Sequence, residues 1–386
     1  MRKELKGFFL MRYKRFKGEK KGGYLALLIL AAVVITCLAY PFFYSALLKK
    51  EFNPNNLIRV SDFKSNGETR EGFAVFSGKL ASFQGTTLKL QAGDGDTLWE
   101  RRMDIKEPFI AALEDIIAVA DMEKGIIYGI DGQGQDLWQT APASGIIRMG
   151  TDGRHIWVIS RQREQAVVEV FNQSGIKISY LQIDGAELTG VSVSREGAFT
   201  AVSTASVKDG SITGSVILYN SDGAILWAKS YRDSLVMGIG FADEHSLIIL
   251  TEETLMSLST GGDIRWQREI EGYITRLLLT DKGVTAINLS DDYRNGVPGS
   301  GTDETVLYDR EGNQLGRFRH NERITGLTEG QYCIGIYSGR RLKKVPLDGR
   351  EASDKEFDGD LMAVYLLENN FIAYISADKL YFESVL

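Results

Sequence analysis

Short stretches of alternating apolar and polar residues follow one another along the chain from residue 57 to its end. Ile126–Ile130 and Val216–Tyr219 are examples, and glycine and small polar residues separate such stretches. A two-residue period is typical of β-strands, whose successive side chains point to opposite faces of a sheet. No stretch in this region keeps the roughly 3.6-residue apolar spacing of an amphipathic helix over a useful length. The pattern therefore predicts an all-β domain of many short strands.

A seven-residue motif repeats in the same region, for example as GDGDTLW at 93–99 and GQGQDLW at 132–138. The intervals between its glycines run from 37 to 50 residues, and four of the five tryptophans stand at its last position. The aligned glycines are Gly95, Gly134, Gly175, Gly223, Gly262, Gly312 and Gly349. The aligned tryptophans are Trp99, Trp138, Trp227 and Trp266. Such a period indicates a repeat protein in which each copy is one structural unit.

The motif has the chemistry of a hairpin turn between two strands. A glycine after a polar residue supplies the positive φ of a tight turn, and the tryptophan falls in the following strand. Two further apolar runs precede each motif, such as Phe109–Leu113 and Ile116–Ala120 in the second copy. Four short strands per forty-odd residues is the period of a β-propeller blade. In such a fold we expect Trp138 and Trp227 to be largely buried between blades.

Counting these units predicts the number of blades. Complete four-strand units cover residues 73–103, 109–141, 146–184, 187–232, 235–271, 273–320 and 323–357. Three more strands follow at Leu361–Leu367, Phe371–Ser376 and Lys379–Val385. Leu57–Phe63 precedes the first unit and could supply their missing outer strand, which would close the ring and remove exposed edges. We therefore expect an eight-bladed β-propeller at 57–386, with seven blades as the alternative if the first unit is partial.

The repeat also carries a resemblance to a known family. Blades that end in D-x-x-G-x-x-L-W, as at 131–138, resemble the PQQ-type, quinoprotein-like propeller repeat, which also occurs in exported propellers without enzymatic activity. One apolar segment ahead of such repeats is similar to a family of single-pass membrane proteins of Gram-positive bacteria. The resemblance implies the propeller fold for about residues 57–386. It implies little about function, because the repeat residues are those of turns and packing.

An uncharged segment precedes the repeats and runs from Tyr24 to Leu48. A helix of that length can cross a ~30 Å hydrocarbon core. A cleaved signal peptide is the alternative, but its apolar region is usually about 7–15 residues long. A lipoprotein signal needs a small residue before its cysteine, whereas Thr36 precedes Cys37 here. We therefore expect 24–48 to be an uncleaved transmembrane signal anchor.

The distribution of charge predicts the orientation of that anchor. Residues 1–23 carry nine Lys or Arg and two Glu, a local charge of +7 in a chain whose net charge is −6. Basic flanks stay on the cytoplasmic side of a membrane segment. We expect 1–23 to be a cytoplasmic tail, 49–56 a linker and 57–386 an extracytoplasmic domain. Aromatic residues among the basic ones leave a second role open for the tail, which is binding to the anionic inner leaflet.

Patterns for catalysis or metal binding are missing from the sequence. The quinoprotein resemblance implies a tryptophan stack, a metal-bound carboxylate set and typically a vicinal disulfide at a cofactor site, but Cys37 and Cys333 are far apart. The histidines fall in different blades and are interpreted as surface or turn residues: His155, His245 and His320. Asp94–Asp96 is interpreted as a turn rather than a calcium loop. We expect no enzyme activity, no cofactor, no metal and no nucleic-acid partner.

Two long segments interrupt the regular spacing, Ser203–Ser215 and Asn288–Thr305. Both fall between the second and third strands of their blades, so we expect two loops on one face of the propeller. Long loops on a rigid scaffold are where binding residues concentrate, although a tolerated surface insertion is the alternative. The candidate partner-binding residues are Asp291, Asp292, Tyr293 and Arg294.

These features favour a membrane-anchored extracytoplasmic propeller that acts as a protein-interaction scaffold in the cell envelope. The expected partner is another envelope protein. The alternative is a receptor that binds a small ligand or a glycan in the central funnel. Aromatic and carboxylate side chains around one mouth of the funnel would favour the receptor, and apolar side chains filling the funnel would favour the scaffold.

Overall fold

The computed structural model describes residues 71–208, 210–290, 302–350, 352–377 and 379–385. All of them belong to the second of the chain's two units, Leu57–Leu386. The expected cytoplasmic tail, the anchor at 24–48, the linker at 49–56 and the strand Leu57–Phe63 lie outside the described residues. Within the described part, no helix is both long enough and apolar enough to cross a membrane.

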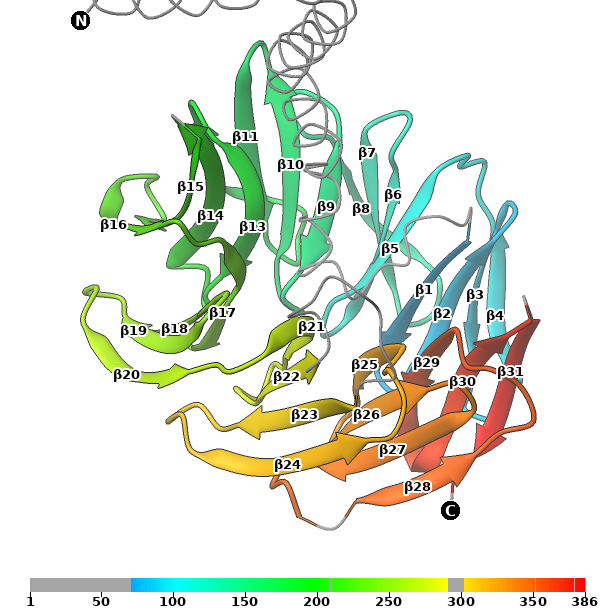
Figure 1. The fold of residues 1–386 in the computed structure, drawn as a ribbon. Helices are drawn as coiled ribbons and strands as arrows, with labels where there is room; N and C mark the ends of the chain where they lie inside the picture. Colours follow the sequence, from blue (N-terminus) through cyan, green and yellow to red (C-terminus); the bar gives the residue numbers. More distant parts are fainter. Residues whose placement is uncertain (1–70, 209, 291–301, 351, 378, 386) are drawn as a thin grey trace, which may run out of the picture. The chain divides into compact units, whose positions relative to one another are not determined.

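The described chain folds as an eight-bladed β-propeller (Figure 1). Seven blades are four-stranded antiparallel sheets whose strand order follows the chain, and the eighth has three described strands. The first strands of most neighbouring blades contact one another, including β29 of the last blade and β1 of the first, and between blades 3 and 4 the contact is between β10 and β13. The sheets therefore close into a ring with their first strands innermost.

The strands of each blade have the following bounds. Blades 1 and 2 contain β1 (Glu71–Phe76), β2 (Lys79–Gln84), β3 (Thr87–Gln91), β4 (Thr97–Arg102), β5 (Pro108–Ala112), β6 (Ile116–Asp121), β7 (Ile126–Asp131) and β8 (Asp136–Thr140). Blades 3 and 4 contain β9 (Arg148–Thr151), β10 (Ile156–Gln162), β11 (Gln165–Phe171), β12 (Lys177–Ile183), β13 (Glu187–Val193), β14 (Phe199–Lys208), β15 (Ser211–Asn220) and β16 (Ile225–Arg232).

Blades 5 to 8 continue the same order. Blades 5 and 6 contain β17 (Val236–Asp243), β18 (Ser246–Thr251), β19 (Thr254–Ser259), β20 (Ile264–Glu269), β21 (Tyr273–Leu279), β22 (Thr285–Ser290), β23 (Asp303–Tyr308) and β24 (Gln314–His320). Blades 7 and 8 contain β25 (Gly326–Glu329), β26 (Cys333–Ser338), β27 (Arg341–Pro346), β28 (Ser353–Glu356), β29 (Ala363–Leu366), the 3-10 turn η4 (Glu368–Asn370), β30 (Phe371–Ser376) and β31 (Lys379–Ser384).

The number of blades confirms the prediction made from the repeat. The seven complete units and the three extra strands all form as counted, with their bounds shifted by only a few residues. The seven-blade alternative is wrong, because β1–β4 form a complete sheet. The described part of blade 8 lacks a strand beyond β31, which is the position that Leu57–Phe63 was expected to fill.

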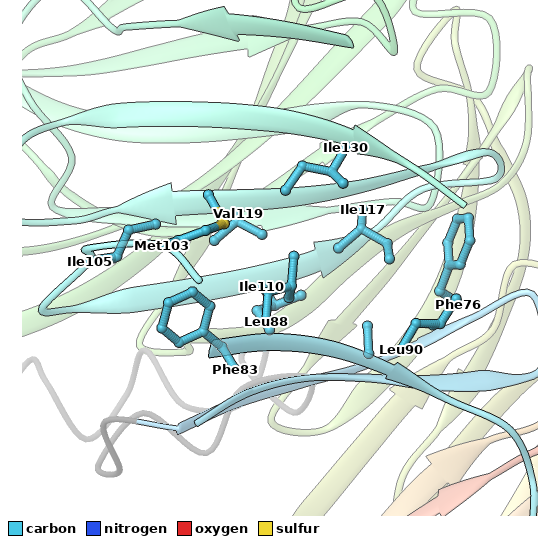
Figure 2. Close-up of a cluster of buried hydrophobic side chains, with 11 residues drawn as sticks. Phe76, Phe83, Leu88, Leu90, Met103, Ile105, Ile110, Ile117, Val119 and Ile130 are labelled. Carbon is cyan, nitrogen blue, oxygen red and sulfur yellow. The ribbon is translucent and has the colours of Figure 1, made fainter. Parts of the chain in front are cut away.

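The hydrophobic core lies between the blades, where adjacent sheets face each other. Figure 2 shows this core for blades 1 and 2, in which Phe83 packs in one cluster with Ile117 and Val119. The alternate residues of the same strand, Ala118 and Ala120, belong to the next cluster, toward blade 3. β6 is buried along its whole length because it has a blade on both sides. Each large apolar side chain buried in this way contributes about 1.5–3 kcal/mol.

Each of the four repeat tryptophans joins its own blade to the next one. The indole N–H of Trp99 donates to the carbonyl of Gly132 at 2.8 Å, and a Cβ on Gly134 would come within 3.0 Å of the ring. Gly134 also has a φ of 83°, so both the turn and the tryptophan require glycine there. The other three bonds are Trp138 to Gln173 O (2.7 Å), Trp227 to Thr260 O (3.1 Å) and Trp266 to Arg310 O (2.8 Å).

The expectation that Trp138 and Trp227 are largely buried needs a correction. Both side chains pack between blades as predicted, but both remain partly exposed. They lie on fourth strands, at the rim of the ring, where a neighbouring sheet covers each indole only in part.

Blades 8 and 1 close the ring, and Figure 1 shows the red strands beside the blue ones. The backbone N–H of Glu368 donates to Gly78 O at 2.8 Å, and its carboxylate pairs with Lys79 at 3.3 Å. Phe382 of β31 packs on Gly95, the turn position that tryptophans cover in other blades. A backbone hydrogen bond, an ion pair and an aromatic contact therefore join the described strands of blade 8 to blade 1.

Candidate functional site on the loop face

Every blade has the same antiparallel strand order, so equivalent connections emerge on the same side of the ring. We call the side that carries the β14–β15 and β22–β23 connections the loop face. The opposite side, which carries the glycine turns between third and fourth strands, is called the turn face. Both segments selected from the sequence belong to the loop face, as expected. The candidate residues Asp291, Asp292, Tyr293 and Arg294 lie outside the described residues.

Blade 4 carries an extended hairpin where the sequence predicted a loop at Ser203–Ser215. β14 and β15 each contain ten residues and stay paired up to Lys208 and Ser211. Val207, close to the tip, is exposed. The loop expectation is wrong because β-branched residues in this segment favour strands, while their small polar neighbours weaken the apolar alternation. The segment is an ordered strand pair rather than an irregular loop.

Blade 6 holds a network of buried polar side chains at the strand ends that flank residues 291–301. Asn288 donates through Nδ2 to Asp303 Oδ2 (2.9 Å) and to Thr275 Oγ1 (2.7 Å). The hydroxyl of Thr305 donates to Asn288 Oδ1 (2.9 Å). The backbone N–H of Ile324, in the link to blade 7, donates to Asp303 Oδ2 (3.0 Å). Side chains thus connect β21, β22 and β23 with the neighbouring link, and such a network holds its strands in one arrangement.

His320 extends this network to β24, so its interpretation as a surface or turn residue is wrong: it is a partly buried strand residue. Its Nε2 lies 2.9 Å from Thr305 Oγ1, and because the hydroxyl hydrogen of Thr305 goes to Asn288, the histidine nitrogen is the donor. Burial and, to a smaller extent, the Lys343 ammonium hold the pKa of His320 below its ordinary value. The ring is therefore neutral near pH 7, with its proton on Nε2.

This direction of donation decides what the network can do chemically. A histidine that activates a hydroxyl must accept its proton. In blade 6 the histidine nitrogen donates to Thr305 instead, so His320 does not act as a base toward that hydroxyl. The arrangement supports a role in positioning strands rather than in nucleophilic catalysis.

Asp303 keeps one unused acceptor in the network. Its side chain is 2% exposed, and Oδ1 has no hydrogen-bond partner among the described residues. A buried carboxylate oxygen without a donor is costly, so this position favours a bound N–H or O–H group. This strand end therefore combines a rigid frame with a buried acceptor that no donor of the described residues fills.

The sequence contained a signal for this network that was missed. Asn288 and Ser290 keep the two-residue period of β22, and they pair in register with Thr305 and Asp303 of β23. The prediction from repeat spacing places both pairs in a loop, because the long interval between neighbouring motifs falls there. Polar residues that continue the period of a buried strand on both sides of a connection indicate an internal hydrogen-bond network.

The other residues considered in the sequence lie apart from blade 6. His155 is in a turn of blade 3, as expected, and its Nδ1 lies 3.0 Å from Asp152 Oδ2. Its side chain is buried, so the alternative of a surface residue is wrong. His245 is an exposed turn residue whose ring meets Phe199 edge-on. The Asp96 N–H donates to the Asp94 carboxylate at 3.1 Å, which confirms the turn at 94–96. In the described ranges, no three His, Cys, Asp or Glu side chains gather in a metal-binding group.

Comparisons with known proteins give a family and a likeness in fold. A sequence model of the family of unknown function DUF5711 matches residues 49–381. No curated protein matches the chain. The Dos1 propeller is similar in structure, with a TM-score of 0.53, 9% identity, and coverage of 85% of this chain and 95% of that one.

Two further structures are similar to the chain. BamB from Moraxella catarrhalis has a TM-score of 0.48 and 15% identity, with 80% of this chain and 94% of that one covered. The dihydro-heme d1 dehydrogenase NirN has a TM-score of 0.49 and 12% identity, with 69% and 59% covered. At these identities the likeness concerns the fold alone.

Proposed function

The chain belongs to family DUF5711, and we propose that its propeller is a non-catalytic scaffold that binds another protein through the loop face. The observation that carries the proposal is the pair of features in blades 4 and 6. One is the ten-residue strand pair β14–β15, and the other is the polar network that fixes the strand ends beside residues 291–301. They stand one blade apart on the same face, so together they can flank a patch wide enough for a protein.

The location follows from the sequence. We propose that residues 24–48 anchor the chain in the cell membrane, with the basic tail inside and the propeller outside. Charge asymmetry and the uncharged segment support this orientation. The partner is then another protein of the cell envelope.

Replacement of residues 291–301 by a short Gly-Ser turn tests the binding face. The flanking strands keep their pairing and their polar network, and a change in loop length costs little free energy, so the variant should fold. Affinity capture of the full chain from membranes of its source cells should recover a partner with the wild type and lose it with the variant. Gln133→Ala, in an exposed turn of the turn face, serves as the matched control and should keep the partner. Retention of every partner by the folded variant contradicts the proposal.

Topology is tested separately with membrane-impermeant labels. A tag after Leu386 should react in intact cells, and a tag at the N-terminus should react only after the membrane is opened. Labelling of the C-terminal tag only in opened cells would contradict the proposed location.

A further inference from the structure

After two of the four repeat tryptophans, the residue two positions further along makes a second contact between blades. Arg101 follows Trp99 in this way and donates to Gly134 O at 2.9 Å. Arg268 follows Trp266 and donates to Gly312 O, also at 2.9 Å. Both guanidinium groups are therefore used to hold the glycine turn of the next blade.

Lys229 occupies the same position after Trp227, but its ammonium group is not used in this way. It makes no hydrogen bond and no ion pair with any described residue. The side chain is nevertheless only partly exposed, on the side of β16 that faces blade 5. Blade 4 thus presents a half-buried cation that the fold leaves unpaired.

The residue that the neighbouring blade places opposite this cation also differs between blades 2 and 5. In blade 2, Asp136 stands two residues before Trp138 and pairs with Arg101 at 3.0 Å. In blade 5 the residue two before Trp266 is Ile264, whose side chain is 56% exposed. An exposed aliphatic side chain therefore replaces the carboxylate that would neutralise the cation.

Between these residues lies an open groove of about 410 Å³ that runs along the outer strands of blades 4 and 5. Met256, Leu258 and Ile264 form its apolar part. The Tyr231 hydroxyl meets only the sulfur of Met256, at 3.5 Å, and the Ser234 hydroxyl is buried without a partner in the described structure.

Charge within the groove favours an acidic ligand. Its acidic lining residue, Glu253, is in the turn between β18 and β19 and forms no ion pair with Lys229. Lys229 and the Tyr231 hydroxyl can therefore donate to a carboxylate of a ligand, and such charge-assisted hydrogen bonds are the stronger kind. The adjacent methionine adapts to apolar side chains of different shapes.

We propose that this groove binds an extended peptide segment of a partner protein that carries an acidic side chain next to an apolar one. The carboxylate bonds to Lys229 with help from the Tyr231 hydroxyl, and the apolar side chain covers Met256 and Ile264. The inference rests on the proposed scaffold function and adds to it a second contact, on the rim between blades 4 and 5. Its ligand chemistry is independent of residues 291–301.

A phage-displayed library of random linear peptides, selected on the purified full chain, tests the groove. Selected peptides should share an Asp or Glu beside an apolar residue. Synthetic copies should bind Lys229→Gln at least about tenfold more weakly than the wild type, as expected for the loss of a charged hydrogen bond. Ile264→Asp, which recreates the carboxylate of blade 2, should weaken binding equally, because the new side chain pairs with Lys229.

Two controls separate this groove from residues 291–301. Lys89→Gln removes a lysine that already pairs with Glu100 at 3.2 Å in blade 1, and it should leave peptide affinity unchanged. Replacement of 291–301 should also leave it unchanged. Thermal unfolding confirms that each variant is folded. Failure to select such peptides, or equal affinity for the wild type and Lys229→Gln, overturns the inference. Partner capture through residues 291–301 is tested separately, and its outcome does not depend on the groove.

Discussion

At the scale of single residues, one contact explains why the motif contains both glycine and tryptophan. The indole donates to a carbonyl two residues before the glycine of the next blade, and its ring needs the space that a Cβ would fill. The sequence predicted these positions from their spacing. It did not predict which backbone carbonyl accepts the indole hydrogen bond, or that the indole stays partly exposed. Both depend on how far adjacent sheets diverge at the rim.

Trp138→Ala tests the energy of that contact. Loss of a partly buried indole and its 2.7 Å hydrogen bond should lower the free energy of unfolding by about 2–4 kcal/mol. Trp138→Phe keeps most of the packing and should cost less. Denaturant unfolding measures both variants, and equal stability of Trp138→Ala and the wild type would show that the contact contributes nothing.

The partly buried histidine of blade 6, His320, predicts a dependence of stability on pH. Because the folded state holds the pKa of His320 below its ordinary value near 6.5, the unfolded chain binds the proton first as the pH falls. His320 should therefore lower the free energy of unfolding progressively below about pH 6.5. His320→Gln can still donate to Thr305 but does not titrate. Between about pH 7.5 and pH 5 the wild type should lose more stability than this variant, and an equal loss contradicts a buried neutral histidine.

At the scale of elements, strand alternation predicted the blades well and the loop-face segments poorly. In buried strands such as β6 the apolar residues are continuous or alternate strongly, so the strand is evident. In β14 and β15 small polar residues fill the same positions, and in blade 6 Asn288 and Asp303 replace apolar side chains with a hydrogen-bonded pair. Hydrophobicity alone carries no information about strands stabilised in these two ways.

Hydrogen exchange distinguishes a strand pair from a loop in blade 4. Amides that are paired within β14, β15 and β16, including those between Thr204 and Lys208 and between Ser211 and Ser215, should be protected relative to an unstructured peptide. An irregular loop would exchange at the unprotected rate. Such fast exchange through Thr204–Ser215 would contradict the extended hairpin.

At the scale of the whole molecule, closure of the ring makes the propeller a rigid support for the loop face. Counting repeats predicted eight blades, but it did not predict that Phe382 would cover the first glycine turn in place of a tryptophan. No repeat motif marks the last blade, so only the structure reveals that contact. Addition of Leu57–Phe63 as the outer strand of blade 8 stays a prediction from the sequence.

Site-specific photo-crosslinking in living cells tests the central claim, that one face of this ring binds a protein. A photoreactive amino acid is placed in the full chain at Arg340 or Arg163, which belong to second-to-third-strand turns of the loop face, and at Gln133 or Glu311 on the turn face. A discrete crosslinked protein is expected from the loop-face positions and none from the turn-face positions. Crosslinks of equal strength from both faces, or from the turn face alone, would contradict it.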